Sequence, residues 1–216
     1  MRVEEVVKHR RTQKKPVKIA YAHRSVEGVV IRRFDANCDS FDELTSMLHR
    51  AFARLGAMGL NCTCVDQPAS VTRARATRGD CFVAVSHGRL IGTITLYAPE
   101  RDSPCQLYRQ ADVASMRQFG VDPQWQNRGI GQLLLALADH WAATRGYAGL
   151  ALDTPQPAAH LVAFYRGQGF RIQGFQRFDG KRYDSAILAR CPVAARTRAA
   201  WTHRLELPAR TLARAA

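Results

Sequence analysis

The chain has 216 residues, 46% of them hydrophobic, and carries a formal net charge of +14. This length and composition predict one domain of ordinary size with tails. No stretch approaches the roughly 18 uninterrupted apolar residues of a membrane span, and the charged N-terminal segment lacks the apolar centre of a secretory signal, so we expect a cytoplasmic protein without a membrane contact.

The positive charge is concentrated at the two ends of the chain. Residues 1–28 hold eight Lys/Arg and three Glu, and residues 190–216 hold six Arg and one Glu, which leaves only +4 for residues 29–189. We therefore expect a basic, poorly ordered N-terminal arm over 1–28, a folded domain over 29–190, and an Ala/Arg-rich tail or added helix over 191–216.

The first third of the domain reads as a strand and two helices. A β-branched run, Val29 to Ile31, suits a first strand. Ser40 is placed to cap a helix, with Glu43 reaching back to it, and the helix extends to Gly56. Its buried face repeats at helical spacing through Leu44, Met47, Leu48, Ala51, Phe52 and Leu55. A second helix is expected over 70–78, with Arg73, Arg75 and Arg78 on a solvated face.

The middle of the chain predicts a hairpin and then a strand that leads into a helix. The hairpin strands are Cys81–Val85 and Leu90–Tyr97, and after a polar loop a strand is expected over Ser115–Val121. A helix follows the next turn. Its apolar positions fit one helical face: Ile130, Leu133, Leu134, Leu137, Ala138 and Trp141.

The last part of the domain predicts a strand, a helix and a hairpin. The strand is Gly149–Asp153, and the helix carries Tyr165 before it gives way at glycine. Two strands, Phe170–Phe178 and Arg182–Leu188, flank Asp179-Gly180, a dipeptide that favours a tight hairpin turn.

The six cysteines do not form a recognisable metal or disulfide pattern. There is no CxxC pair, and Cys62-Thr63-Cys64 lacks a second, His-bearing half. We therefore expect reduced, partly buried thiols and no metal.

The segment 126–131 carries the chemistry that the sequence reveals best. It lies between an expected strand and an expected helix and reads Gln126, Asn127, Arg128, Gly129, Ile130, Gly131. Such a turn presents unpaired backbone amides and the positive end of the helix dipole to one point, which suits a pyrophosphate. Glycine lets the backbone approach the anion, and Arg128 adds positive charge nearby. Neither a dinucleotide fingerprint nor an ATPase phosphate loop is present.

Three elements in the same order resemble the GNAT superfamily of N-acetyltransferases. The first is the 126–131 turn, preceded by Val121-Asp122-Pro123, and the second is the segment from Phe164 to Phe170. The third is the order of strands and helices over 29–188, which contains both segments. The resemblance implies a mixed α/β (α+β) fold, in which about four helices flank a central, mostly antiparallel, twisted sheet of six to seven strands. Many members carry an Asn seven residues before the matching tyrosine, where this chain has Ala158.

The resemblance also implies site residues. Backbone groups of Phe119, Gly120 and Val121 would hold the pantetheine arm of acetyl-CoA and polarise the acetyl carbonyl, while 126–131 would bind its pyrophosphate. The matching tyrosine, Tyr165, would protonate the leaving thiolate. The strand before the turn lacks the glutamate base of some members, so Asp153, at the end of its strand, is our candidate base; it could equally cap the following loop, and ordered water could replace it.

The resemblance implies transfer of an acetyl group from acetyl-CoA to a primary amine in a direct ternary complex. The loop over about 56–70 and the hairpin around Gly180 would border the acceptor. Two alternatives stay open: a longer-chain N-acyltransferase on the same fold, and a non-catalytic nucleic-acid-binding or regulatory protein that uses its basic tails. A homodimer is compatible with each of them.

Overall fold

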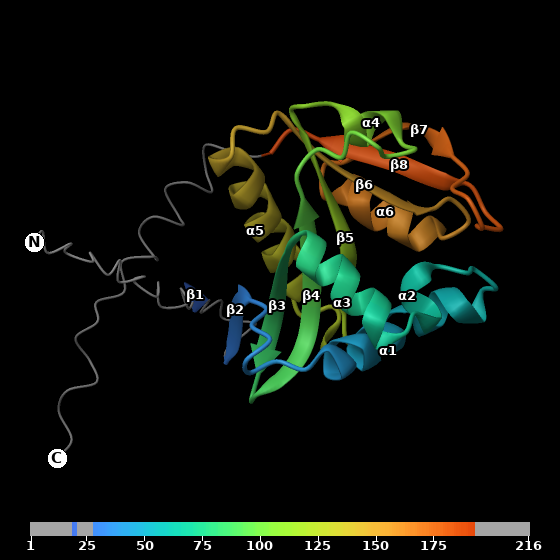
Figure 1. Cartoon of the computed structure of the whole chain (residues 1–216). Coiled ribbons are helices and arrows are strands. Elements are labelled where there is room, and N and C mark those ends of the chain that lie inside the picture. The colour runs from blue at the N-terminus through green and yellow to red at the C-terminus, as the bar shows by residue number, and fades with distance from the viewer. Residues whose placement is uncertain (1–18, 21–27, 193–216) are drawn as a thin grey trace, which may run out of the picture.

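The structure is a computed structural model that describes residues 19–20 and 28–192. These residues form one eight-stranded sheet in the order β1-β2-β3-β4-β5-β6-β8-β7 (Figure 1). All neighbouring strands are antiparallel except β5 and β6, which are parallel. The strands are β1 (Ile19–Ala20), β2 (Val29–Arg33), β3 (Asp80–Ser86), β4 (Arg89–Tyr97), β5 (Val113–Val121), β6 (Gly149–Pro155), β7 (Arg171–Gln176) and β8 (Ser185–Arg190).

Helices cover both faces of the sheet. A Cβ on Gly120 of β5 would point at α1, whereas Phe119 and Val121 on the same strand contact Gly131 of α5, so α1 and α5 lie on opposite faces (Figure 1). The helices of the described residues are α1 (Phe41–Ala57), α2 (Thr63–Asp66), α3 (Ala69–Arg78), α4 (Gln106–Arg109), α5 (Ile130–Thr144) and α6 (Ala159–Gly167), with a 3-10 turn, η1 (Pro123–Trp125).

The mixed α/β fold with a mostly antiparallel sheet is confirmed. The sequence predicted six to seven strands, and the eighth, β1, has two residues and lies within the expected N-terminal arm. The four longer helices were predicted, whereas α2 and α4, of four residues each, were not, because one helical turn is too short to show a period of 3.6 residues.

Helix α1 begins as predicted, but its capping box does not form. The Ser40 hydroxyl accepts hydrogen bonds from the backbone N–H of Asp42 and of Glu43, at 3.1 and 3.3 Å. The Glu43 side chain does not return to Ser40. Its Oε1 accepts from the N–H of Leu90, at 3.0 Å. The prediction for Glu43 is wrong because the start of β4 brings a backbone donor to this carboxylate.

The tight turn predicted at Asp179-Gly180 forms, because Lys181 N donates to Phe178 O at 3.1 Å, but the prediction that strands flank it directly is wrong. Strand β7 ends at Gln176 and β8 begins at Ser185, so a longer loop, 177–184, joins them. The side chain of Asn61, before α2, donates to Gly180 O at 2.8 Å and accepts from Arg182 N at 3.1 Å. These bonds to a distant segment replace the strand ladder next to the turn.

The sheet opens along the line between β5 and β6. The two strands pair only over residues 113–115 and 149–151. Beyond this point β5 continues along β4 to Val121, and β6 continues along β8 to Pro155. The two halves of the sheet therefore separate towards the carboxyl ends of β5 and β6.

A bulge in β5 lies at the level of this opening. The β4–β5 register passes from Thr95↔Arg117 to Thr93↔Gly120, so that Gln118 and Phe119 together face a single residue of β4. Gln118 has φ +48°, which is unusual for a residue other than glycine. Bulges bend a strand and are frequent beside active sites.

Two expectations fall mainly outside the described residues. The N-terminal arm over 1–28 is described only at Ile19–Ala20 and at Gly28, and the C-terminal tail over 191–216 only at its first two residues. The order of the arm and of the tail, and any contact of either with nucleic acid, stay predictions. No helix within the described ranges is long and apolar enough to cross a membrane.

Candidate active site

A cleft of about 900 Å³ lies where the two halves of the sheet separate. Its wall includes the carboxyl halves of β5 and β6, the turn before α5, one face of α6, and residues from α1, the start of α2, α3 and the 177–184 loop. From the sequence-predicted set it includes Phe119, Gly120, Val121, Gln126, Asn127, Gly129, Gly131, Asp153 and Tyr165. Most of the predicted site residues thus meet in one cavity.

Two backbone amides of β5 face the opening. The N–H of Asp122 donates to Ile91 O of β4 at 2.9 Å. Because successive residues of a strand turn their backbone groups to alternate sides, the N–H of Gly120 also faces β4, and those of Phe119 and Val121 face away from it. Since β6 has already diverged at this level, these two N–H groups point into the cleft.

The turn before α5 presents further amides to the same cavity. Gly129 caps the helix in a left-handed conformation, with φ +84°, which a side chain would strain. Its carbonyl accepts from Leu133 N at 3.0 Å, so the amides of residues 130–132, in the first helical turn, have no partner within the helix. These amides and the helix dipole favour an anion. Gln126 ties the turn to β5, because its Nε2 donates to Val121 O at 3.0 Å.

Two residues of the predicted pyrophosphate segment keep their side chains out of the cleft. Ile130 is buried in the core beneath α5, at 1% exposure, so only its backbone is available. Arg128 is exposed, and its guanidinium lies over the ring of Trp125, 5.0 Å from the centroid. Its charge is near the turn, but its side chain is not part of the cavity wall.

Tyr165 lies on α6 with its ring packed in an aromatic cluster. Its neighbours are Phe119, Phe164 and Phe170, at centroid distances of 6.2, 5.3 and 5.9 Å. Burial, assisted by the negative charge of Asp153, raises the pKa of the Tyr165 phenol above its ordinary value. The phenol is therefore protonated at neutral pH, which is the state that a hydrogen-bond donor requires.

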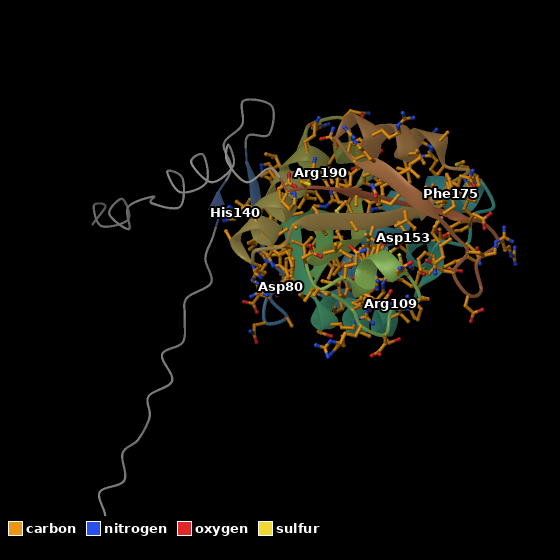
Figure 2. The ribbon with its side chains drawn as sticks, turned by 90° about the horizontal axis from the view of Figure 1, so that it is seen from above. Asp80, Arg109, His140, Asp153, Phe175 and Arg190 are labelled. Carbon is orange, nitrogen blue, oxygen red and sulfur yellow. The ribbon has the colours of Figure 1, made fainter. Side chains whose placement is uncertain are left out.

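Asp153 lies on β6 in the middle of the domain, close to α4 (Figure 2). Its Oδ1 accepts a hydrogen bond from the hydroxyl of Tyr108, on α4, at 2.9 Å. Burial and this nearby carboxylate raise the pKa of the Tyr108 phenol well above its ordinary value. Asp153 is half-buried and lines the cleft, so one carboxylate oxygen is held by Tyr108 beside the cavity.

A second cavity of about 280 Å³ shares part of its wall with the cleft. The residues common to both are Thr63, Arg75, Arg117, Asp153, Lys181 and Tyr183. None of the residues of the turn over 126–131 lines this smaller cavity. It therefore lies on the side of Asp153 away from the expected pyrophosphate site.

Of these shared residues the sequence interpretation named only Asp153 as a site residue, although three of the others carry a positive charge, Arg75 and Lys181 among them. Arg75 was expected on a solvated face with Arg73 and Arg78, but it is half-buried and lines both cavities, so that expectation is wrong for Arg75. It lies three residues after the fully buried Thr72, on the same side of α3, a spacing that could have identified it. Lys181 belongs to the hairpin that was expected to border the acceptor, but the sequence gave no reason to single out its charge from the other basic residues of that hairpin.

Ala158, which stands where many members of the resembling family carry Asn, is the N-cap of α6 and makes no side-chain cap bond. It is fully buried and packs with Leu55, Leu60, Cys62 and Tyr183. A methyl group here seals the contact between α6 and the segment after α1. Any ligand contact at this position would have to come from the backbone.

All six cysteines are free, and four of them are buried. Two of the buried thiols line the cleft: Cys62, which accepts from the Tyr183 hydroxyl at 3.3 Å, and Cys64. Burial raises the pKa of both thiols, so neither is an activated nucleophile. Among the described residues no group of three or more His, Cys, Asp or Glu side chains could hold a metal ion.

Taken together, the diverging half-sheets, the amides of β5 and the glycine turn at a helix N-terminus form one cleft along β5 whose backbone donors favour an anion. The family model described as Acetyltransferase (GNAT) family matches residues 46–170, more than half of the chain. The chain belongs to this family of acetyltransferases.

Solved structures of acetyltransferases share the fold. The ribosomal-protein-S18-alanine N-acetyltransferase from Escherichia coli superposes with a TM-score of 0.56 at 18% identity, over 76% of this chain and 94% of that one. An acetyltransferase from Streptococcus agalactiae gives 0.59 at 16%, over 77% and 99%. A GNAT family acetyltransferase from Elizabethkingia anophelis with acetyl-CoA bound gives 0.52 at 18%, over 77% and 99%. No curated protein sequence matches the chain.

Proposed function

We propose that the protein transfers an acetyl group from acetyl-CoA to a primary amine, directly and within a ternary complex. The observation that carries this proposal is the single cleft in which two free amides of β5, the glycine turn of α5, Tyr165 and Asp153 meet. The likeness to a family member with acetyl-CoA bound supports the same ligand here.

The described residues fit acetyl-CoA as a co-substrate. The amides of 130–132 and the backbone at Gly129 would hold the pyrophosphate, with Asn127 and Gln126 beside it. The N–H groups of Phe119 and Val121 would pair with the pantetheine arm and with the acetyl carbonyl. Attack on a thioester builds negative charge on that oxygen, and a fixed amide donor stabilises it.

The reaction needs no covalent intermediate on the protein. The amine nitrogen forms a bond to the acetyl carbon, the carbon–sulfur bond breaks, and CoA leaves as its thiolate. The proton from nitrogen passes to Asp153, directly or through water, and the CoA thiolate accepts a hydrogen bond from the Tyr165 hydroxyl and then takes a proton that solvent supplies through that hydroxyl. Since both thiols in the cleft are kept protonated by burial, a cysteine acyl intermediate has no support in this site.

Tyr165 is the proposed hydrogen-bond donor to the departing sulfur. Its raised pKa keeps the hydroxyl protonated but also makes it a weak acid. We therefore propose that the Tyr165 hydroxyl stabilises the negative charge on sulfur by a hydrogen bond while the carbon–sulfur bond breaks. The sulfur gains its proton only after the bond has broken.

The test is a calorimetric titration with acetyl-CoA followed by a thiol-release assay on a panel of amines. Tyr165→Phe should lower kcat by about 100-fold or more, the lower end of general acid–base contributions, with little change in the affinity for acetyl-CoA. Tyr147→Phe is a matched control, because Tyr147 stacks on Trp141, away from the cleft. If Tyr165→Phe turns over as fast as the wild type, the role given to Tyr165 is wrong.

The remaining sequence expectations have tests of their own. A panel of acyl-CoA chain lengths distinguishes acetyl transfer from the longer-chain alternative. Salt-dependent retention on DNA that is lost when 1–28 and 191–216 are removed would support the nucleic-acid alternative. A cytoplasmic location and a homodimer stay predictions.

A further inference from the structure

Arg75 is a half-buried cation whose hydrogen-bond partners are neutral. Its Nη1 donates to Gln67 Oε1 at 2.8 Å and lies 3.3 Å from Cys64 Sγ. Within the described residues no carboxylate lies within ion-pair distance of it, whereas Arg78, on the same helix, pairs with Glu100. Arg75 thus brings an unneutralised charge to both cavities.

Lys181 brings a second such charge, from the 177–184 loop. Its Nζ donates to Asn61 O at 2.8 Å and to Thr63 Oγ1 at 3.0 Å, and it forms no ion pair within the described part of the chain. These two bonds hold the ammonium group in place and leave one of its three protons for another acceptor.

The charge of the smaller cavity is therefore positive. Its cationic residues are Arg75, Arg117 and Lys181, and its only carboxylate is Asp153. Arg117 is paired with Glu100, at 2.5 Å, but Glu100 also pairs with Arg78, so the charge of Arg117 is only partly neutralised. Placing unpaired cations in a partly buried cavity costs free energy, which an anionic ligand would offset.

A further polar side chain lies in the wall of the adjoining cleft. Gln118, at the bulge in β5, is 3% exposed, and its Oε1 accepts from Thr95 Oγ1 at 3.2 Å. Its Nε2 is buried without a hydrogen-bond partner among the described residues. A buried donor without a partner is uncommon in folded proteins, so this group also favours an acceptor atom supplied by a ligand.

We infer that the acceptor is a small amine that also carries a carboxylate, of the size of an amino acid, with its carboxylate between Arg75 and Lys181 and its amine beside Asp153. The inference rests on the proposed function. An arginine and a lysine that line the same cavity match a carboxylate, and about 280 Å³ is at the small end of ligand cavities. The same charges oppose polyamines and other polycationic acceptors.

The experiment compares acceptors that differ only in the anionic group. After acetyl-CoA binding has been measured, thiol release is followed for amino acids of several chain lengths, each beside its carboxamide, and for putrescine and an aminoalkyl phosphate. The wild type should prefer each carboxylate over its amide by about 10- to 100-fold in kcat/KM, the range of a charge-assisted hydrogen bond.

Substitutions at Arg75 and Lys181 test whether these two residues cause the preference for a carboxylate over an amide. Arg75→Gln and Lys181→Gln should each bring the carboxylate-to-amide ratio towards one, with acetyl-CoA affinity unchanged, and Arg75→Lys should retain part of it. The matched controls are Arg73→Gln and Arg182→Gln, since both side chains are exposed and line neither cavity. Thermal unfolding of each variant checks that the fold is kept.

The outcomes separate the two proposals. Equal use of amides and carboxylates, or preference for putrescine, overturns the carboxylate inference while the acetyltransferase proposal stands. Preference for the aminoalkyl phosphate would mean that Arg75 and Lys181 bind a phosphate group, and it overturns the inference that the acceptor carries a carboxylate. If acetyl-CoA does not bind, or no amine releases thiol, the proposed function fails, and the inference fails with it.

Discussion

Adding one methyl group at Gly120 tests the packing of α1 against β5. An ideal Cβ at this position would lie 3.1 Å from Ala51 Cβ and 3.3 Å from Phe52 Cε2. Carbon atoms prefer separations of about 3.5–4.0 Å, and β5 cannot move away because its backbone is paired with β4. The helix must therefore shift by a few tenths of an ångström. Overpacking of this kind costs about 1–3 kcal/mol.

The net effect is smaller than the packing cost. Replacing glycine by alanine also restricts the unfolded chain, which stabilises the fold by about 0.4–1 kcal/mol. For Gly120→Ala we expect a net loss of about 1–2 kcal/mol in the free energy of unfolding. At about 2–4 °C per kcal/mol for a chain of this size, Tm should fall by roughly 2–8 °C.

Gly131→Ala provides the matched control on the other face. Its Cβ would lie 3.6 Å from Phe119 Cζ and 3.7 Å from Phe164 Cζ, which are ordinary contacts. Alanine also suits a helix better than glycine does, so the stability should be unchanged or higher. Urea unfolding measures the free energy of unfolding of both variants, and an unchanged m-value shows that the two values can be compared. If Gly120→Ala is as stable as Gly131→Ala, α1 does not contact β5 as described.

Two further predictions concern stability away from the cleft. Burial alone would raise the pKa of Asp39, but bonds from Arg32, at 2.5 and 2.6 Å, and from a backbone amide lower it. Because the pKa of Asp39 is lower in the folded than in the unfolded chain, its ionised carboxylate stabilises the fold fully above the ordinary pKa near 4, and this stabilisation is lost as the pH falls through the folded pKa. Asp39→Asn should therefore reduce Tm at pH 7 and make the fall of Tm below about pH 4 less steep. Asn61→Ala removes both side-chain bonds to the 177–184 loop and should accelerate tryptic cleavage after Lys181 or Arg182, detected by mass spectrometry; unchanged cleavage would contradict the tethering of this loop.

The elements that the sequence predicted well are those with long, regular patterns. Helix α5 shows apolar residues at helical spacing over three turns, and the strand before it is apolar and bounded by Asp122-Pro123. The turn between them follows from glycine chemistry, since Gly129 needs a left-handed backbone. These local signals were enough to predict where the free amides of the first helical turn would lie.

The parts that the sequence could not predict depend on contacts between distant segments. Glu43 bonds to β4, and the 177–184 loop is held by Asn61, more than 100 residues earlier in the chain. The bulge at Gln118 and the early separation of β5 from β6 are likewise set by pairing in three dimensions. The positive side of the smaller cavity combines Arg75 and Lys181, whose proximity no local pattern indicates.

The separation of β5 from β6 gives the sheet an edge in its interior. Over Met116–Val121, β5 pairs on one side only, as the terminal strands of a sheet do. Exposed edges invite another chain to add a strand. This one is out of reach of another protein's sheet, because α1 and α5 cover the two faces (Figure 1) and residues of α6 form part of the cleft wall. Only a narrow, flexible molecule can use its hydrogen bonds, so the fold protects the protein from self-association at the same strand that it offers to a ligand.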